Sequence, residues 1–155
     1  MLLLRHASSG NRLESPTLDR LRPLDRVGQA QARKLSQARA QYAIERIVSS
    51  PHRRCVETVR PLAEARGLEI ETREALAPDA RVEDTAALLD ALPDASLVCT
   101  HREAIERLFD GAVACEKGGT WVLERRGAHW LPTEYLPPPV RAEQARRAPA
   151  VVRNG

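Results

Sequence analysis

The sequence has few aromatic residues, and its basic residues are almost all arginine. Phenylalanine, tryptophan and tyrosine together make up 3% of the 155 residues, so a buried core must consist mainly of leucine, valine, isoleucine and alanine. Lys34 and Lys117 are the only lysines, and the formal net charge is +3. Such a mild excess of positive charge suits an anionic substrate and is too small to indicate nucleic-acid binding.

Cysteine is also scarce, and no apolar run is long. The sequence has three cysteines, Cys55, Cys99 and Cys115. Because their number is odd and no two are closely spaced, they argue against a disulfide framework and for a reducing compartment. The apolar residues 1–4 are followed at once by Arg5 and His6, which ends the run far short of a signal-peptide core or a membrane span. We therefore expect a cytoplasmic protein that does not contact a membrane.

Two further patterns are missing. The sequence has no internal repeat and no glycine-rich phosphate loop of the GxxxxGK[ST] type, which excludes a repeat array and this common mode of nucleotide binding. A length of 155 residues fits one ordinary domain with one core. We therefore expect one active site or binding face.

Short apolar segments alternate with segments of helical spacing. The strand-like segments are residues 1–4, 44–49, 68–71 and 95–100, and a closing hairpin is expected over 120–124 and 128–135. The helical segments are 24–40, 51–65, 82–92 and 102–109, and Asp79 marks the start of the third. The polar stretch between the first strand and residue 24, which contains Gly10, Pro16 and Pro23, is expected to be a loop. This alternation predicts an α/β fold, a three-layer α/β/α sandwich around a mainly parallel sheet.

Three consecutive prolines at 137–139 end this pattern. We predict one domain over residues 1–136 and a tail over 137–155 that is rich in proline and arginine and irregular in structure. The arginines of the tail are interleaved with Glu143 and lack aromatic neighbours, which favours a solvated surface over a nucleic-acid contact.

Polar, chemically active residues follow three of the predicted strands. Arg5 and His6 follow the first strand, Arg54 lies one helical turn beyond the second, and His101 follows the fourth. Ligands of open parallel sheets bind beyond the carboxyl ends of the strands. Two histidines and at least two arginines are therefore expected to converge there.

This set of residues fits phosphoryl transfer. The guanidinium groups of Arg5 and Arg54 match phosphate oxygens and would stabilise the charge of the transition state. A neutral imidazole at His6 can attack phosphorus to form a phosphohistidine that water then hydrolyses, and His101 would add a further donor. This chemistry requires neither a metal nor another cofactor.

Four segments resemble the histidine phosphatase superfamily, also called phosphoglycerate-mutase-like. They occur in the family's order: residues 2–7, residues 22–24 with Gly28 and Gln31-Ala32, residues 49–58, and residues 98–101. The resemblance implies that His6 carries the phosphoryl group and that Arg5, Arg54 and His101 complete the pocket. Because Arg54 precedes Cys55 and lies four residues before Thr58, the motif selects it over Arg53.

The short connections between strands resemble the cap-less branch of this family. That branch includes bacterial phosphohistidine phosphatases and the phosphatase-like module that follows a Nudix domain in some bacterial proteins. By resemblance, Arg12 is an additional phosphate-binding residue. Position 7 is Ala where many relatives have Gly.

The general acid of the family has no clear counterpart. A carboxylic acid usually protonates the leaving group, and the choices after the third strand are Glu74, Asp79, Glu83 and Asp84. We predict Asp79. A missing acid would slow esters of poor leaving groups most, because their departing oxygen needs a proton, and an aryl and an alkyl phosphate would then react at different rates.

Several alternatives remain. A cysteine-dependent phosphatase needs an arginine six positions after its nucleophile, and those positions hold Pro61, Ile105 and Trp121. A zinc site from His52, Cys55 and His101 has no support from spacing. A mutase usually has a more enclosed site. A phosphate-binding or phosphoprotein-binding module without turnover stays open, as do three kinds of phosphorylated partner: a phosphoprotein, a nucleotide or a small phosphate ester.

Overall fold

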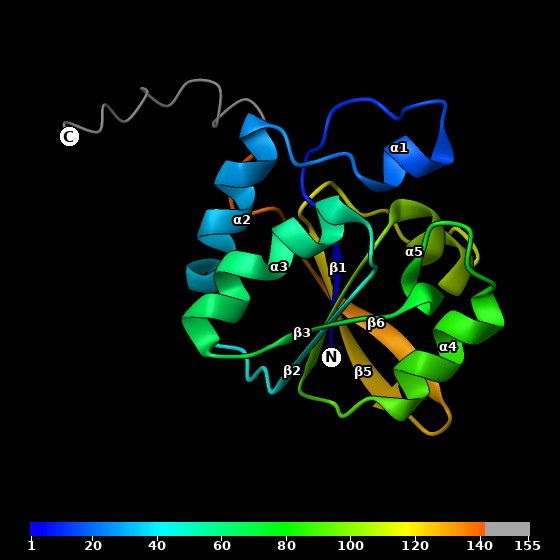
Figure 1. Ribbon diagram of the computed structural model, residues 1–155. Helices are drawn as coiled ribbons and strands as arrows, with labels where there is room; N and C mark the ends of the chain where they lie inside the picture. Colours follow the sequence, from blue (N-terminus) through cyan, green and yellow to red (C-terminus); the bar gives the residue numbers. More distant parts are fainter. Residues whose placement is uncertain (142–155) are drawn as a thin grey trace.

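One six-stranded sheet organises the chain in the computed structural model, which describes residues 1–141 (Figure 1). The strands are β1 (Leu2–Arg5), β2 (Arg46–Ser49), β3 (Ile70–Thr72), β4 (Ser96–Thr100), β5 (Thr120–Arg126) and β6 (His129–Leu136). Their order is β3-β2-β4-β1-β5-β6. The first four strands pair in parallel, whereas β5 pairs antiparallel with both β1 and β6. The predicted mainly parallel sheet and its closing hairpin are confirmed.

Helices cover both faces of this sheet. They are α1 (Pro16–Arg20), α2 (Arg26–Ala38), α3 (Arg53–Arg66), the short 3-10 helix η1 (Glu74–Leu76), α4 (Val82–Ala91) and α5 (Arg102–Leu108). Figure 1 shows α2 and α3 on one side of the strands and α4 and α5 on the other. The predicted three-layer sandwich is therefore confirmed.

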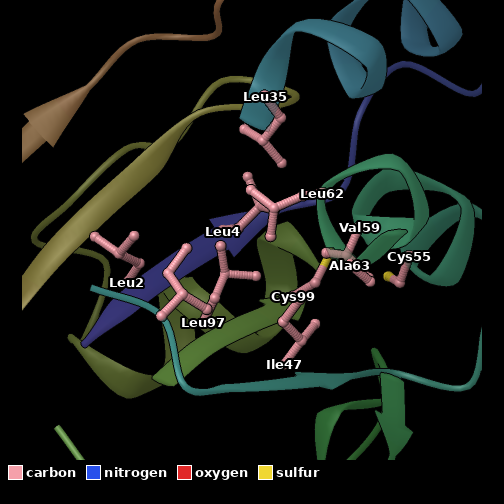
Figure 2. Close-up of a cluster of buried hydrophobic side chains, with 11 residues drawn as sticks. Leu2, Leu4, Leu35, Ile47, Cys55, Val59, Leu62, Ala63, Leu97 and Cys99 are labelled. Atoms are coloured by element: carbon pink, nitrogen blue, oxygen red, sulfur yellow. The ribbon is translucent and has the colours of Figure 1, made fainter. Parts of the chain in front are cut away.

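The alternation of side chains along β1 connects the two halves of the core. Leu2 and Leu4 belong to the cluster that packs under α2 and α3, which Figure 2 shows, whereas Leu3 belongs to the cluster under α4 and α5. All three side chains are buried. Burying a leucine contributes about 1.5 to 3 kcal/mol to folding, so β1 is held firmly from both faces.

Two local features differ from the sequence-based expectation. The segment before residue 24, expected to be a loop, contains α1, whose N-cap Ser15 accepts a hydrogen bond from Leu18 N and whose first residue is Pro16. Five residues are too few to produce a helical period. Asp79 was expected to mark the start of α4, and this is wrong, because Arg81 is the N-cap and the helix begins at Val82.

The segment after β6 packs against α2. The Arg39 guanidinium donates a hydrogen bond to Pro137 O at 2.9 Å, and the Gln31 amide donates one to Val140 O at 3.0 Å. Residues 142–155 of the predicted tail lie outside the described residues. Within residues 1–141, no helix has both the length and the apolar character that crossing a lipid bilayer requires.

Candidate active site

The carboxyl ends of β1, β2 and β4 lie next to one another. In the parallel register Arg5 is opposite Thr100, and Ser49 is opposite Cys99. The residue after each strand is therefore delivered to the same edge of the sheet, and His6 N donates a hydrogen bond to Thr100 O at 3.0 Å. This register brings together the chain segments that carry His6, Ser50 and His101.

The tautomer of His6 is fixed by two hydrogen bonds. Its Nδ1–H donates to Ala7 O at 2.8 Å, and its Nε2 accepts a hydrogen bond from Arg54 Nε at 3.4 Å. Because a guanidinium group only donates, Nε2 is unprotonated, and its lone pair accepts this hydrogen bond. Burial, with smaller effects from the charges of Arg54 and Arg5, lowers the pKa of His6 to about 3. The imidazole is therefore neutral at physiological pH and has a nucleophilic nitrogen.

Arg54 contacts both pocket histidines. Its side chain is 1% exposed, and its Nη2 lies 3.4 Å from His101 Nδ1. Its Nη1 donates to Asp19 O at 2.9 Å. The neighbouring Arg53 faces solvent and pairs with Glu57 at 2.7 Å. Of the two adjacent arginines, Arg54 is the one inside the cluster.

His101 lies between Arg54 and a serine. Since Arg54 donates to Nδ1, the proton of the neutral ring is on Nε2, which donates to Ser50 Oγ at 2.8 Å. The ring centroids of His6 and His101 are 5.3 Å apart. Burial, followed by the neighbouring His6 and the Arg54 charge, lowers the pKa of His101. This imidazole is neutral as well.

Arg5 retains an unused donor. Its Nη1 donates to Cys115 O at 2.8 Å, whereas its buried Nε has no hydrogen-bond partner among residues 1–141. A buried N–H without a partner is unfavourable in the free protein and favours an acceptor that completes it. The Arg5 charge also lowers the pKa of His6, which places it within electrostatic reach of that ring.

Arg12 and Asp79 lie outside this cluster. The Arg12 side chain is 62% exposed and forms an ion pair with Glu103 at 2.7 Å. Arg12 and the exposed Asp79 both line a cavity of about 600 Å³, next to His52 and Asp19. Cavities of a few hundred Å³ accommodate small-molecule ligands. The cavity adjoins the His6 cluster through Asp19, which contacts Arg54, and through His52, which contacts His101.

Among the four carboxylates considered as the acid, only Asp79 lines this cavity. Glu74 forms an ion pair with Arg20, and Glu83 forms one with Arg81 at 3.6 Å. Asp84 lies in the first turn of α4.

Sequence reasoning missed Asp19, a buried carboxylate in α1. Its Oδ1 accepts hydrogen bonds from Leu13 N and Arg22 Nε, both at 2.9 Å, and its Oδ2 lies 3.3 Å from Arg54 Nη2. Burial opposes ionisation, but these hydrogen bonds and the arginine charges lower the pKa of Asp19 overall. The one available signal was its spacing of three residues from Arg22, in a segment that was expected to be a loop.

Three side chains fix the loop that follows His6. Thr58 Oγ1 of α3 accepts a hydrogen bond from Ala7 N at 3.0 Å. Arg22 Nη1 donates to Ser9 O at 2.8 Å, and Asp25, the N-cap of α2, accepts from Ser8 Oγ at 2.7 Å. The resembling segments of the sequence thus meet around this loop.

A third histidine, His52, is the second residue that sequence reasoning missed. Its ring centroid lies 4.8 Å from that of His101. It had been considered only for a zinc site with Cys55 and His101. Among residues 1–141, no group of three His, Cys, Asp or Glu side chains is placed to hold a metal ion.

Comparison with known proteins gives one family and one curated relative. Residues 1–78 match the model of the histidine phosphatase superfamily (branch 1). An 8-oxo-(d)GTP phosphatase from Mycolicibacterium smegmatis is 28% identical over an alignment of 155 positions, which covers 90% of this chain and 48% of that protein. The chain thus spans about half the length of this relative.

Solved structures share the fold. A phosphohistidine phosphatase SixA from Agrobacterium tumefaciens is 24% identical with a TM-score of 0.72, and the alignment covers 88% of this chain and 96% of that one. A tungstate complex of SixA gives 19% identity and a TM-score of 0.75 over the same shares. A phosphoserine phosphatase from Entamoeba histolytica is 16% identical with a TM-score of 0.69, and the alignment covers 86% of this chain and 94% of that one. These likenesses confirm the phosphoglycerate-mutase-like fold.

Proposed function

The chain belongs to the histidine phosphatase superfamily, and from this premise we propose that it hydrolyses a phosphorylated substrate through a phosphohistidine on His6. The observation that carries the proposal is the placement of the unprotonated His6 Nε2 against Arg54 Nε at 3.4 Å. A buried, neutral nucleophile beside a permanent cation is the combination needed to attract a phosphate dianion and attack its phosphorus.

The first chemical step forms the phosphohistidine. Donors from Arg5, Arg54 and His101 bind the nonbridging oxygens of the phosphoryl group. The lone pair on His6 Nε2 attacks phosphorus, a P–N bond forms, and the bond from phosphorus to the leaving group breaks. The hydrogen bond from Nδ1–H to Ala7 O keeps the ring oriented and stabilises the positive charge that the imidazole acquires.

The second step returns the enzyme to its starting state. Water attacks the phosphorus of the phosphohistidine and gives a proton to the carboxylate that protonated the leaving group, the P–N bond breaks, and inorganic phosphate leaves with the oxygen of that water. His6 recovers its lone pair on Nε2. Because the same arginines face the phosphoryl group throughout, both transition states are stabilised by the same donors.

The cavity supplies two further proposed roles. Asp79 protonates the leaving group, since it is the carboxylate among the four considered that lines the cavity. Arg12 binds a substrate phosphate, for which it must exchange its ion pair with Glu103. This exchange requires little energy, because exposed ion pairs contribute about 0 to 1 kcal/mol.

The substrate that we propose to test first is a nucleotide phosphate. The support is the similarity to an 8-oxo-(d)GTP phosphatase, together with a cavity of about 600 Å³ beyond the His6 pocket. The phosphoramidate of a phosphoprotein is the second candidate, which the likeness in fold to SixA phosphohistidine phosphatases favours.

A trapping experiment tests the function. The wild-type chain is mixed with ³²P-labelled substrate and quenched in alkali, in which phosphohistidine survives and phosphoserine does not. We expect label on the protein, no label in His6→Gln, and wild-type labelling in His129→Gln, which changes an exposed histidine of β6. Turnover without labelling of His6 would reject the proposed mechanism, and tight phosphate binding without turnover would identify a binding module.

A further inference from the structure

His52 belongs to a row of three histidines and is the one that lines the cavity. The centroid distances are 5.3 Å between His6 and His101 and 4.8 Å between His101 and His52, and both contacts are edge-on. His52 is 7% exposed, yet it is one of the residues that line the cavity. The mechanism above gives this third imidazole no role.

The hydrogen bonds of this row have a direction. Arg54 donates to His101 Nδ1, so His101 donates from Nε2 to Ser50 Oγ at 2.8 Å. The same hydroxyl also accepts from His52 N at 3.3 Å. With both of its acceptor positions filled, the Ser50 hydroxyl directs its own proton to His52 Nδ1 at 3.2 Å.

This direction determines the state of His52. Because Nδ1 accepts a hydrogen bond, the proton of the neutral ring is on Nε2, and this atom has no hydrogen-bond partner among residues 1–141. Burial, followed by the charges of Arg54 and Arg20, lowers the pKa of His52 and keeps the ring neutral. Asp19 and Asp79, which line the cavity, also act electrostatically on the ring.

We propose that His52 donates a hydrogen bond from Nε2–H to the leaving-group oxygen of the substrate, and that Ser50 is the positioning residue that holds the ring in this tautomer. The proposal rests on the proposed function and deepens it. An oxygen that leaves phosphorus gains negative charge as the P–O bond breaks, and a fixed N–H donor on a side chain that is 7% exposed stabilises that charge. The proton stays on His52, so its role is distinct from the proton transfer proposed for Asp79.

The dependence on the leaving group tests this contact. 4-Nitrophenolate is a good leaving group that needs little stabilisation of its charge, whereas the alkoxide of a simple alkyl phosphate is a poor one that needs much. We expect His52→Phe to lower kcat/KM about 30-fold or more on an alkyl phosphate and less than about threefold on 4-nitrophenyl phosphate, as loss of a donor to a developing oxyanion predicts. His52→Gln, which retains an N–H donor, recovers part of the loss. Equal losses on both esters overturn the proposal.

Two controls separate this proposal from the proposed function. His129→Gln changes an exposed histidine of β6 outside the cavity and should alter kcat/KM on both esters by less than about twofold. If His6→Gln retains turnover, the phosphohistidine mechanism fails. If His6→Gln is inactive and His52→Phe lowers kcat/KM by the same factor on both esters, only the role of His52 fails. A wild-type chain that turns over neither ester rejects both proposals.

The tautomer of His52 can be measured without turnover. In ¹⁵N spectra of the imidazole groups of the free chain, we expect His52 to carry its proton on Nε2 in the wild type. Ser50→Ala should give a mixture of both tautomers, and this variant should repeat the ester preference of His52→Phe in weaker form. A proton on His52 Nδ1 in the wild type contradicts the proposed direction and overturns the proposal.

Discussion

Arg54 depends on a carboxylate that binds two arginines at once. Asp19 accepts hydrogen bonds from Arg22 and the backbone of Leu13, and its Oδ2 lies 3.3 Å from Arg54 Nη2. Through these contacts it fixes the guanidinium that faces His6. Although Asp19 lines the cavity, the geometry gives it the role of a positioning residue for the phosphate pocket.

We therefore expect Asp19→Asn to impair catalysis more than folding. The amide keeps the size of the side chain but loses the charge that orients Arg54, and misplacement of such a group by about 1 Å lowers rates about 100-fold. Steady-state kinetics should show a fall in kcat/KM of about 10- to 100-fold, together with weaker binding of vanadate. Asp90→Asn, which alters an exposed aspartate of α4, is the matched control. Unchanged vanadate binding in Asp19→Asn would contradict this role.

The buried neutral histidines also make stability depend on pH. The pKa of His6 is about 3 in the folded chain and about 6.5 in the unfolded chain, so between these values the unfolded state binds more protons. Stability from this group is complete above about pH 6.5 and is lost as the pH falls toward 3. Between pH 7 and pH 5, protonation of His6 in the unfolded chain lowers the free energy of unfolding by about 2 kcal/mol.

Urea unfolding at several pH values measures this effect. The free energy of unfolding of the wild type should fall on acidification, and the fall should be smaller in His6→Gln by about 2 kcal/mol over this range. His129→Gln, at an exposed position, should retain the wild-type slope. An identical pH slope in His6→Gln and the wild type would show that His6 is not held neutral by burial.

At the scale of elements, the loop after β1 is clamped against the start of α2. Ser8 Oγ donates to Asp25, and Asp25 Oδ1 in turn accepts from Gly28 N at 2.8 Å. A Cβ at position 28 would overlap the carbonyl group of Ser8. Glycine at this position allows the loop that carries Ala7 and Ser8 to rest directly on the helix.

Gly28→Ala should therefore disturb both the fold and the site. The methyl group must displace the backbone of Ser8, which we expect to lower the free energy of unfolding by about 1 to 3 kcal/mol, despite the better helix propensity of alanine. The shift should also lower kcat/KM, because Ser8 follows His6 by two residues. Urea unfolding and steady-state kinetics check both effects, and Gln29→Ala on the exposed side of α2 is the control. Greater stability in Gly28→Ala would contradict close packing of the Ser8 backbone on α2.

The sequence predicted most elements because their signals are local. Continuous apolar runs marked β1 and β4, and helical spacing marked α2, α3, α4 and α5 within a few residues of their ends. The pocket of His6, Arg54 and His101 was also predictable, since each residue follows a strand of a parallel sheet. The clusters around Asp19 and His52 were not, because they form through hydrogen bonds between segments whose relative positions only the folded backbone sets.

At the scale of the whole molecule, the domain boundary is open to experiment. We propose that the folded domain continues past residue 136, at which the prolines suggested that it ends. Hydrogen bonds from Arg39 to Pro137 O and from Gln31 to Val140 O join the segment after β6 to α2. Gln31 also accepts from Ser8 N at 3.0 Å, which connects this segment to the loop beside His6.

Two shortened chains test this proposal. A chain that ends at residue 141 keeps both hydrogen bonds to α2 and serves as the reference. A chain that ends at residue 136 loses two hydrogen bonds worth about 1 kcal/mol each, and its Tm should be lower by about 4 to 8 °C. Thermal unfolding followed by circular dichroism measures the difference. Equal Tm values for the two shortened chains would support the boundary at residue 136.

The few aromatic residues of this chain give its unfolding an optical signature. Both tryptophans lie in the hairpin at one edge of the sheet, Trp121 in β5 and Trp130 in β6. Indole fluorescence therefore reports when the hairpin detaches, whereas far-ultraviolet ellipticity reports the melting of the helices on both faces. If the two signals change at the same urea concentration, the hairpin and the helices unfold as one cooperative unit.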